Sequence, residues 1–307
     1  MKKILFWSLL AISFPALFFC AEDPRIVKLK DRREGIIGRQ VLAKMLVKEK
    51  SESVGPVLEK IYSDPNEEMK MRVSAAKFIG ELPYKDAFAA LLDVVKNKDE
   101  DVDLRQASVE AIGAFDDKQS FLELGGFGNF SNKLAAVYLD AVEKSRYRRD
   151  KDVLLTLGQF LSGSLYPEIK KKAIALLSES NDKRTLTLLM IALQDKTPSV
   201  RKDVIKHISR IGGSSAVPLY INRLEEEKRP EIREMFADEL LKLPIPKLKK
   251  VWIEDLTKRI QQEPLDGTKE KLTQALDRIK KAQANPETAV QLNAVTTETP
   301  AKVPIKK

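Results

Sequence analysis

Cysteine and histidine are almost absent from this 307-residue chain, which contains one of each, Cys20 and His207. With a single cysteine the chain can form no internal disulfide, so its stability has to come from core packing. Metal sites that need two or more His or Cys ligands cannot be assembled in one chain. A catalytic triad would have to use His207, which we interpret as a surface or half-buried helix residue.

Recognisable phosphate and nucleotide motifs are missing as well. The chain has no phosphate-binding loop followed by Lys-Ser or Lys-Thr, and Gly125, Gly126 and Gly128 do not match the dinucleotide fingerprint, because serine stands at residue 131. Carboxylate-only catalysis stays open, since there are 45 acidic residues, but no pair stands out. We predict a protein that is not an enzyme and that binds no cofactor and no metal ion.

The N-terminus has the layout of a secretory signal. Lys2 and Lys3 precede an uncharged apolar run over residues 4–19, after which the composition turns polar. Sixteen helical residues span roughly 24 Å, which is short for a hydrocarbon core of about 30 Å. We predict a signal peptide over residues 1–21, although a cut after Ala21 places the large Phe19 at position −3.

Two other outcomes stay open for this end of the chain. Cys20 follows the apolar run and is a candidate for lipidation, as in a bacterial lipoprotein; Leu17 fits that motif and Phe19 does not. An uncleaved anchor is the third outcome. All three predict an exported protein, periplasmic or associated with the cell envelope.

Charge is plentiful and of both signs. Charged residues make up 32% of the chain, and the net charge is +9. One interpretation is a well-solvated helical surface, and the other is a face that binds anions. The basic clusters are Lys28 to Arg33, Arg146 to Arg149 with Lys151, Lys170 to Lys172, and Lys247 with Lys249 and Lys250.

An arginine returns every 33 residues, at Arg39, Arg72 and Arg105, with the same apolar pattern around it. Residues 72–80 overlay residues 105–113, and both segments end in glycine. A fixed period of this length is typical of stacked helical pairs. The sequence therefore predicts an all-α protein, an α-solenoid of helical hairpins.

The repeats divide the chain into segments. We predict a basic lead-in over residues 22–36, the solenoid over 37–283 with an irregular break at 116–131, and a disordered tail over 284–307, where Pro, Thr, Ala, Glu and Lys dominate. In the first repeat the apolar spacing predicts a helix over about residues 38–47 that buries Val41, Leu42, Met45 and Leu46.

The segments around the later arginines carry a family resemblance. Residues 99–105 and 195–201 each run from an aspartate to an arginine six residues on, and residues 227–233 run from a glutamate to an arginine. This pattern resembles the HEAT repeat in its short bacterial form, over about residues 37–260. The resemblance implies stacked HEAT-like hairpins, but a function only in broad terms, because such repeats serve scaffolds, adaptors, chromophore lyases and a few DNA-repair proteins.

The repeated acids and arginines have two interpretations. They can form a structural ladder, in which the acid caps a helix or turn and the arginine bridges to it or to a neighbouring copy. Alternatively, the arginines can bind phosphates or carboxylates along one face. We favour the ladder, because positions that repeat with the core period are explained by the stack itself. Its predicted members are Asp99, Arg105, Asp195, Arg201, Glu227 and Arg233.

The break at residues 116–131 is the most distinctive segment outside the repeats. It places Phe127 and Phe130 among glycines, where the rings either anchor a partner or fold inward and fill the break. We name Phe127, Phe130, Arg146, Arg148 and Arg149 as candidate partner contacts.

The function predicted from the sequence is a non-enzymatic protein-binding or scaffold module of the bacterial cell envelope, which holds a partner along the solenoid surface. The basic clusters suit an acidic protein, anionic lipid heads or a polyanionic polymer, whereas an export signal argues against nucleic acid. One alternative is a structural subunit of an envelope or appendage assembly. The other alternative is a lyase-like enzyme.

Overall fold

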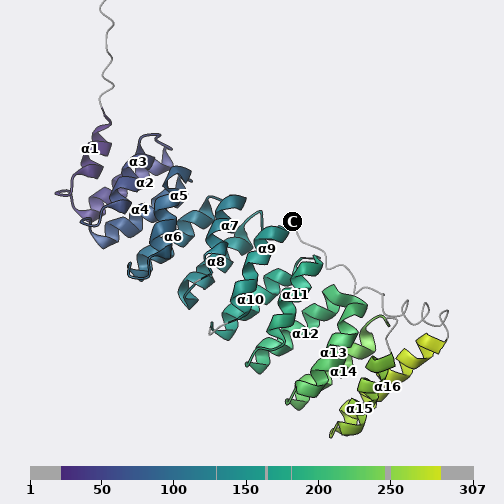
Figure 1. Cartoon of the computed structure of the whole chain (residues 1–307). Coiled ribbons are helices and arrows are strands. Elements are labelled where there is room, and N and C mark those ends of the chain that lie inside the picture. Colours follow the sequence, from purple (N-terminus) through teal and green to yellow (C-terminus); the bar gives the residue numbers. More distant parts are fainter. Residues whose placement is uncertain (1–21, 129, 163–164, 181, 246–249, 285–307) are drawn as a thin grey trace, which may run out of the picture.

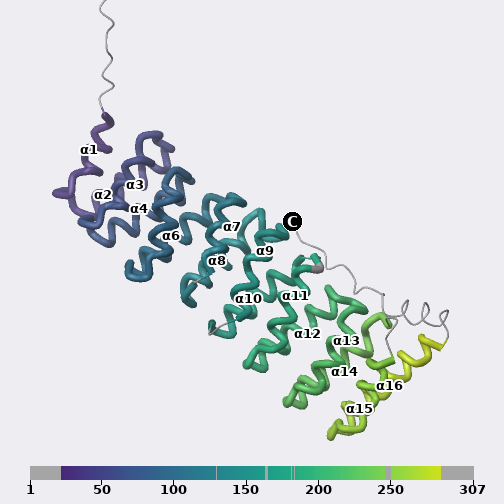
Figure 2. Tube along the Cα trace, viewed as in Figure 1, coloured from purple at the N-terminus to yellow at the C-terminus, as the bar shows by residue number. Residues whose placement is uncertain are grey.

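The structure is a computed structural model that describes residues 22–128, 130–162, 165–180, 182–245 and 250–284. These residues form an elongated stack of helices, and no strand occurs among them (Figures 1 and 2). The predicted all-α solenoid is therefore confirmed. The α-helices are α1 (Pro24–Lys30), α2 (Ile36–Lys48), α3 (Val54–Ser63), α4 (Met69–Glu81), α5 (Phe88–Lys96), α6 (Val102–Ala114), α7 (Lys118–Gly126), α8 (Asn132–Lys144), α9 (Lys151–Thr156), α10 (Pro167–Ser178), α11 (Lys183–Ala192), α12 (Pro198–Gly212), α13 (Ala216–Glu226), α14 (Pro230–Lys242), α15 (Lys250–Gln262) and α16 (Asp266–Ala284). The short 3-10 helices are η1 (Lys85–Ala87), η2 (Leu157–Leu161) and η3 (Gly213–Ser215).

The helices lie in two rows. The even-numbered helices from α2 to α16 are the first helices of the units, and each packs against the next one in its row. The odd-numbered helices from α3 to α15 are the second helices, and they lie on the other side of the stack (Figure 1). One continuous apolar core runs between the rows. Each unit therefore buries its apolar face only by stacking on its neighbours.

Local sequence explains where the helices begin. Proline occupies the first turn of α10, α12 and α14, where its missing N–H is not needed. Aspartate caps three consecutive second helices, where its carboxylate accepts hydrogen bonds from the free amides of the first turn. These caps are Asp117 of α7, Asp150 of α9 and Asp182 of α11.

The predicted basic lead-in is a helix that belongs to the stack. Helix α1 fills residues 24–30 and buries Ile26 and Leu29 against α2 and α3. The prediction that α2 buries Val41 and Met45 is wrong, because these side chains are 53% and 45% exposed. Among the described residues, no first helix precedes α2. The face of α2 that would pack against a preceding first helix is therefore exposed.

Residues 116–131 are less irregular than predicted. They contain α7, a second helix that packs against α6 and α9, and the stack runs through this region without interruption. Among the described residues of the segment, only 116–117, 127–128 and 130–131 lie outside helices. The glycines that suggested a break instead end α7.

Both predicted terminal segments lie outside the described residues, apart from Ala284 at the end of α16. This applies to the signal peptide with Cys20 and to the tail that follows the stack. In the part of the chain that the structure describes, no helix has the length and apolar character needed to cross a bilayer.

Candidate functional site

A ladder of buried ion pairs ties the units together. The fourth residue of a first helix is a base, and its partner is an acid in the loop that leads to the next first helix. The Arg39 guanidinium donates two hydrogen bonds to Glu67, at 2.9 and 2.7 Å, and its Nε donates to the Leu29 carbonyl at 2.9 Å. Bidentate geometry of this kind fixes orientation as well as adding energy. The other pairs are Arg72 with Glu100, Lys170 with Asp195, Arg201 with Glu227 and Arg233 with Glu263.

Two acids in the second half of the stack, Asp195 and Glu227, each serve two units. The Asp195 carboxylate accepts from Lys170 of the preceding unit, while the Asp195 backbone carbonyl accepts from Arg201 at 2.8 Å. Burial opposes the ionisation of Asp195, but hydrogen bonds from Lys170 and Thr197 hold its pKa below the ordinary value. For Arg201 and Arg233, the carboxylate partner is thus the acid of the following unit, and the acid six residues upstream contributes its backbone carbonyl.

Two predicted ladder residues differ from this pattern. The acid that pairs with Arg72 is Glu100, whereas the neighbouring Asp99 is exposed and has no ion pair among the described residues. Arg105 is 8% exposed and donates only to the Val95 carbonyl, at 3.2 and 2.9 Å. No carboxylate of the described residues lies within ion-pair distance of Arg105.

The ladder is interrupted after Arg105 because two charged positions have become apolar. Glu67 and Glu100 stand two residues before α4 and α6, and the matching position before α8 is Phe130. The fourth residue of α8 is Ala135, which is fully buried where the other first helices carry a base. In the described part of the chain, the third and fourth units, and likewise the fourth and fifth, are therefore joined without the ladder pairs used elsewhere.

An aromatic cluster fills the interrupted position. The Phe130 ring centroid lies 5.4 Å from that of Tyr138 and 5.3 Å from that of Phe160, and Phe127 packs edge-on against Phe130 at 5.8 Å. The Tyr138 hydroxyl donates to the Phe121 carbonyl at 3.0 Å. Both Phe127 and Phe130 are half-buried and contact the core, which is the inward arrangement that the sequence left as an alternative.

The three predicted arginine contacts pair with acids of neighbouring units. Arg146 donates to the Asp116 carbonyl at 2.8 Å, and Arg148 binds both carboxylate oxygens of Glu179, at 3.1 and 2.5 Å. Arg149 lies 3.6 Å from Glu179 and keeps 77% of its side chain exposed. Their role in binding a partner stays a prediction.

Sequence reasoning missed a second ladder at the starts of the second helices. Lys85 pairs with Asp117 at 3.4 Å, and Lys118 pairs with both Asp150 and Asp152 at 2.9 Å. The signal was an Asp-Lys dipeptide that recurs at 117–118, 150–151 and 182–183. Because Asp117 and Asp150 also cap their helices, each places its carboxylate beside the base of the preceding unit.

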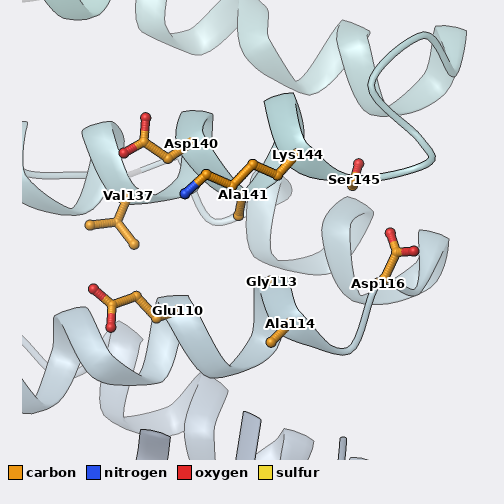
Figure 3. Close-up of a pocket in the computed structure, with 9 residues that line it drawn as sticks. All are labelled: Glu110, Gly113, Ala114, Asp116, Val137, Asp140, Ala141, Lys144 and Ser145. Atoms are coloured by element: carbon orange, nitrogen blue, oxygen red, sulfur yellow. The ribbon is translucent and has the colours of Figure 1, made fainter. Parts of the chain in front are cut away.

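The groove between α6 and α8 is the candidate site, and it lies along the C-terminal halves of the two helices whose N-terminal ends lack the ladder pair. Its volume is about 490 Å³, and Figure 3 shows the residues that line it. The floor is made of small residues because the two helices approach closely: a Cβ added to Gly113 would come within 2.5 Å of the Ala141 Cβ. The lining residues are Glu110, Gly113, Ala114, Asp116, Val137, Asp140, Ala141, Lys144 and Ser145.

Charged groups line the rim of this groove. Lys144 extends along α8 towards Asp140, and Glu110 faces it from α6 (Figure 3). Asp140 pairs with Lys172 and Asp116 pairs with Arg146, whereas no carboxylate of the described residues lies within ion-pair distance of Lys144. The groove can therefore receive an apolar group on its floor and polar groups at Glu110 and Lys144.

The turn between α6 and α7, which borders the groove, has an unusual backbone conformation. Asp116 has a φ of +44°, in the left-handed region, where its contacts with Arg146 hold the turn between α6 and α7. In the described ranges, no three His, Cys, Asp or Glu side chains are grouped so that they could hold a metal ion.

Comparisons with known proteins support the architecture. A protein-family model described as HEAT repeats matches residues 154–241, which supports a HEAT-repeat protein. The chain is similar to the complex of CpcE and CpcF of phycocyanin lyase from Nostoc sp. PCC7120, at 15% identity and a TM-score of 0.39, covering 87% of this chain and 98% of that one. It is also similar to human deoxyhypusine hydroxylase, at 16% identity and a TM-score of 0.37, covering 84% and 95% of the two chains. No curated protein matches the sequence.

These neighbours correct one prediction. Both are enzyme-related proteins, so the prediction that this chain is not an enzyme, drawn from its lack of His, Cys and catalytic motifs, is wrong. At TM-scores below 0.5 they transfer no activity to this chain.

Proposed function

We propose that this chain is a binding module of the bacterial cell envelope that holds a protein partner in the groove between α6 and α8. The observation that carries the proposal is the groove itself, which has a floor of small residues and two rim groups of opposite charge, Glu110 and Lys144. A partner side chain that packs on the floor would replace water there, and the rim charges would set its orientation.

The place of the groove in the stack supports this proposal. Ladder ion pairs join the described first helices at every junction except those on either side of α8, and at the α6–α8 junction an aromatic cluster stands in their place. Arg146 also links the groove to the predicted contact set, since it binds Asp116 on the groove wall. A junction without a ladder pair and the candidate site therefore lie between the same two first helices, α6 and α8.

Site-specific photo-cross-linking in the native cell envelope tests this proposal. A photoreactive residue at Ala114, which is exposed and lines the groove, is expected to capture a protein in a discrete adduct. Ala175 is the matched control, because it is an exposed alanine on the first helix α10. Capture of the same protein equally well from Ala175, or no adduct from Ala114, would contradict a specific groove.

A lyase-like enzyme is the second candidate. It is favoured by the groove volume of about 490 Å³, which is in the range of small-molecule sites, and by polar groups that converge on it. Native mass spectrometry of the protein purified from its own cells is expected to show a bound small molecule in this case. Glu110→Gln and Lys144→Met should then abolish its retention, whereas in the protein-binding case no such adduct is seen.

Export is part of the proposal and rests on the N-terminal sequence alone. The expected result of cell fractionation is that the protein is found in the periplasm or envelope. Mass spectrometry of the mature N-terminus distinguishes cleavage after Ala21 from lipidation of Cys20. A cytoplasmic protein that keeps Met1 would overturn export but leave the groove proposal testable with cytosolic partners.

A further inference from the structure

Helix α2 presents an apolar stripe at the N-terminal end of the stack. Ile37, Val41 and Met45 are 77%, 53% and 45% exposed. They are spaced four residues apart, so they share one helix face. Figure 1 places α2 at the end of the molecule where the chain enters the stack.

Val41 and Met45 belong to the face that the following first helices turn towards the preceding one. In the next unit, Ser74 of α4 accepts a hydrogen bond from Gln40 of α2, and further along Ala111 of α6 lies against Gly80 of α4. Val41 and Met45 hold positions one period before Ser74 and Phe78, but no first helix of the described residues stands before α2.

The opposite end of the stack is finished differently. The exposed residues along α16 are polar, as a terminal repeat in contact with water requires. These residues include Lys269, Glu270, Thr273, Gln274, Asp277 and Lys280. The two ends therefore differ. The face of α16 is polar and suits contact with water, whereas the apolar stripe on α2 suits contact with a partner.

Unpaired lysines surround the stripe. Lys44 and Lys48 lie on the same face of α2, and Lys28 and Lys50 are also exposed. None of these lysines has a carboxylate of the described residues within ion-pair distance, whereas Arg25, Arg32 and Arg39 at this end are all paired. An apolar stripe bordered by free lysines is complementary to an anionic lipid surface, where the lysines reach the headgroups and the apolar groups enter the interface.

We propose that the α1–α2 end of the stack docks on an anionic lipid bilayer. The uncharged run over residues 4–19 supports this occupant, because an uncleaved anchor or a lipidated Cys20 would hold α1 close to the bilayer surface. From Cys20 to Pro24 the chain can reach at most about 14 Å. The proposal rests on export and is independent of the groove between α6 and α8.

A second copy of the chain fits this face less well. A two-fold contact through α2 would bring Lys44 and Lys48 of one copy towards the same lysines of the other. A single helix face is also small compared with the roughly 1,000 Å² or more that a specific interface needs.

Depth-dependent fluorescence quenching tests the docking. The full chain carrying Cys20→Ser and a single introduced cysteine, Val41→Cys or Gln274→Cys, is labelled with an environment-sensitive probe and reconstituted into vesicles with a spin-labelled lipid quencher. In phosphatidylglycerol-containing vesicles we expect strong quenching at position 41 and none at position 274, which lies on the outer face of α16. Phosphatidylcholine vesicles should give weaker quenching at position 41.

A charge variant separates docking from tethering. Lys44→Glu with Lys48→Glu should remove the preference for anionic vesicles while circular dichroism stays unchanged, because both side chains are exposed. Absence of quenching at position 41 in vesicle-bound protein overturns the proposal. The proposal also fails if the probe at position 41 is already shielded from water without vesicles, because the chain's own N-terminus would then cover the stripe. It fails as well if this shielding increases with protein concentration, because a second copy of the chain would then cover the stripe.

Discussion

At the scale of residues, buried ion pairs are part of what holds this protein together. Arg39 is 1% exposed and Glu67 is 8% exposed, so this pair is part of the core. Removing one partner of such a pair leaves the other charge buried and uncompensated, which costs far more than the loss of an exposed pair. The ladder therefore fixes how each unit stacks on the next.

The adjacent acids Glu100 and Asp99 provide a matched test of the ladder. Glu100→Gln is expected to lower the free energy of unfolding by about 2 kcal/mol, because Arg72 keeps its burial and loses its counter-charge. Asp99→Asn should change it by less than about 0.5 kcal/mol, because Asp99 is exposed. Urea denaturation of the two variants measures both values. Equal effects would contradict the assignment of Glu100 as the ladder acid.

The ladder also predicts how stability depends on pH. Arg39 lowers the pKa of Glu67; burial opposes the ionisation of Asp195 and Glu227, but Lys170 and Arg201 bring their pKa values below the ordinary range. A carboxyl with a lowered pKa contributes stability above its unfolded pKa and loses it as the pH falls through the folded value. The urea midpoint should therefore fall as the pH drops below about 4. Combined Glu67→Gln and Glu227→Gln should flatten this dependence, and an unchanged slope would exclude these carboxylates as its source.

At the scale of elements, the close approach of α7 to its neighbours depends on having glycine, with no side chain, at residue 125. A Cβ added to Gly125 would lie 2.4 Å from the Tyr138 hydroxyl and 2.6 Å from the Thr156 hydroxyl, which hydrogen-bond each other at 2.9 Å. The next residue, Gly126, has open space at that position. Two consecutive glycines of one helix thus differ in what they can tolerate.

Alanine substitutions at these glycines are expected to differ. Gly125→Ala should lower the free energy of unfolding by roughly 1–3 kcal/mol, because the new methyl group displaces the buried hydroxyl pair. Gly126→Ala should be neutral or slightly stabilising, since alanine favours a helix and meets no neighbour. Thermal denaturation of both variants provides the comparison. A destabilised Gly126→Ala would show that backbone conformation, and not packing, controls this turn.

At the scale of the whole molecule, the stack behaves as a row of nearest neighbours. Ladder pairs join adjacent units, and the extensive helix–helix contacts of the described residues all lie within a unit or between adjacent units. Damage to one junction is therefore expected to stay local.

Hydrogen exchange tests this locality. Glu227→Gln removes the acid that Arg201 binds, so amide exchange should become faster in α12 and α14. Exchange in α2 and α4, several units away, should be unchanged. A uniform increase along the chain would mean that the stack opens as a single cooperative unit.

By itself the sequence determined the helical stack, its period and the positions of most ladder bases, because burial and stacking repeat at fixed intervals along the chain. It also indicated the unusual segment at residues 116–131 and the aromatic residues in it. What it could not provide was the partner of each group: Glu100 rather than Asp99 for Arg72, no carboxylate for Arg105, and exposure rather than burial for Val41 and Met45. Those outcomes depend on which unit stands on either side, and only the tertiary structure brings residues about 30 positions apart into contact.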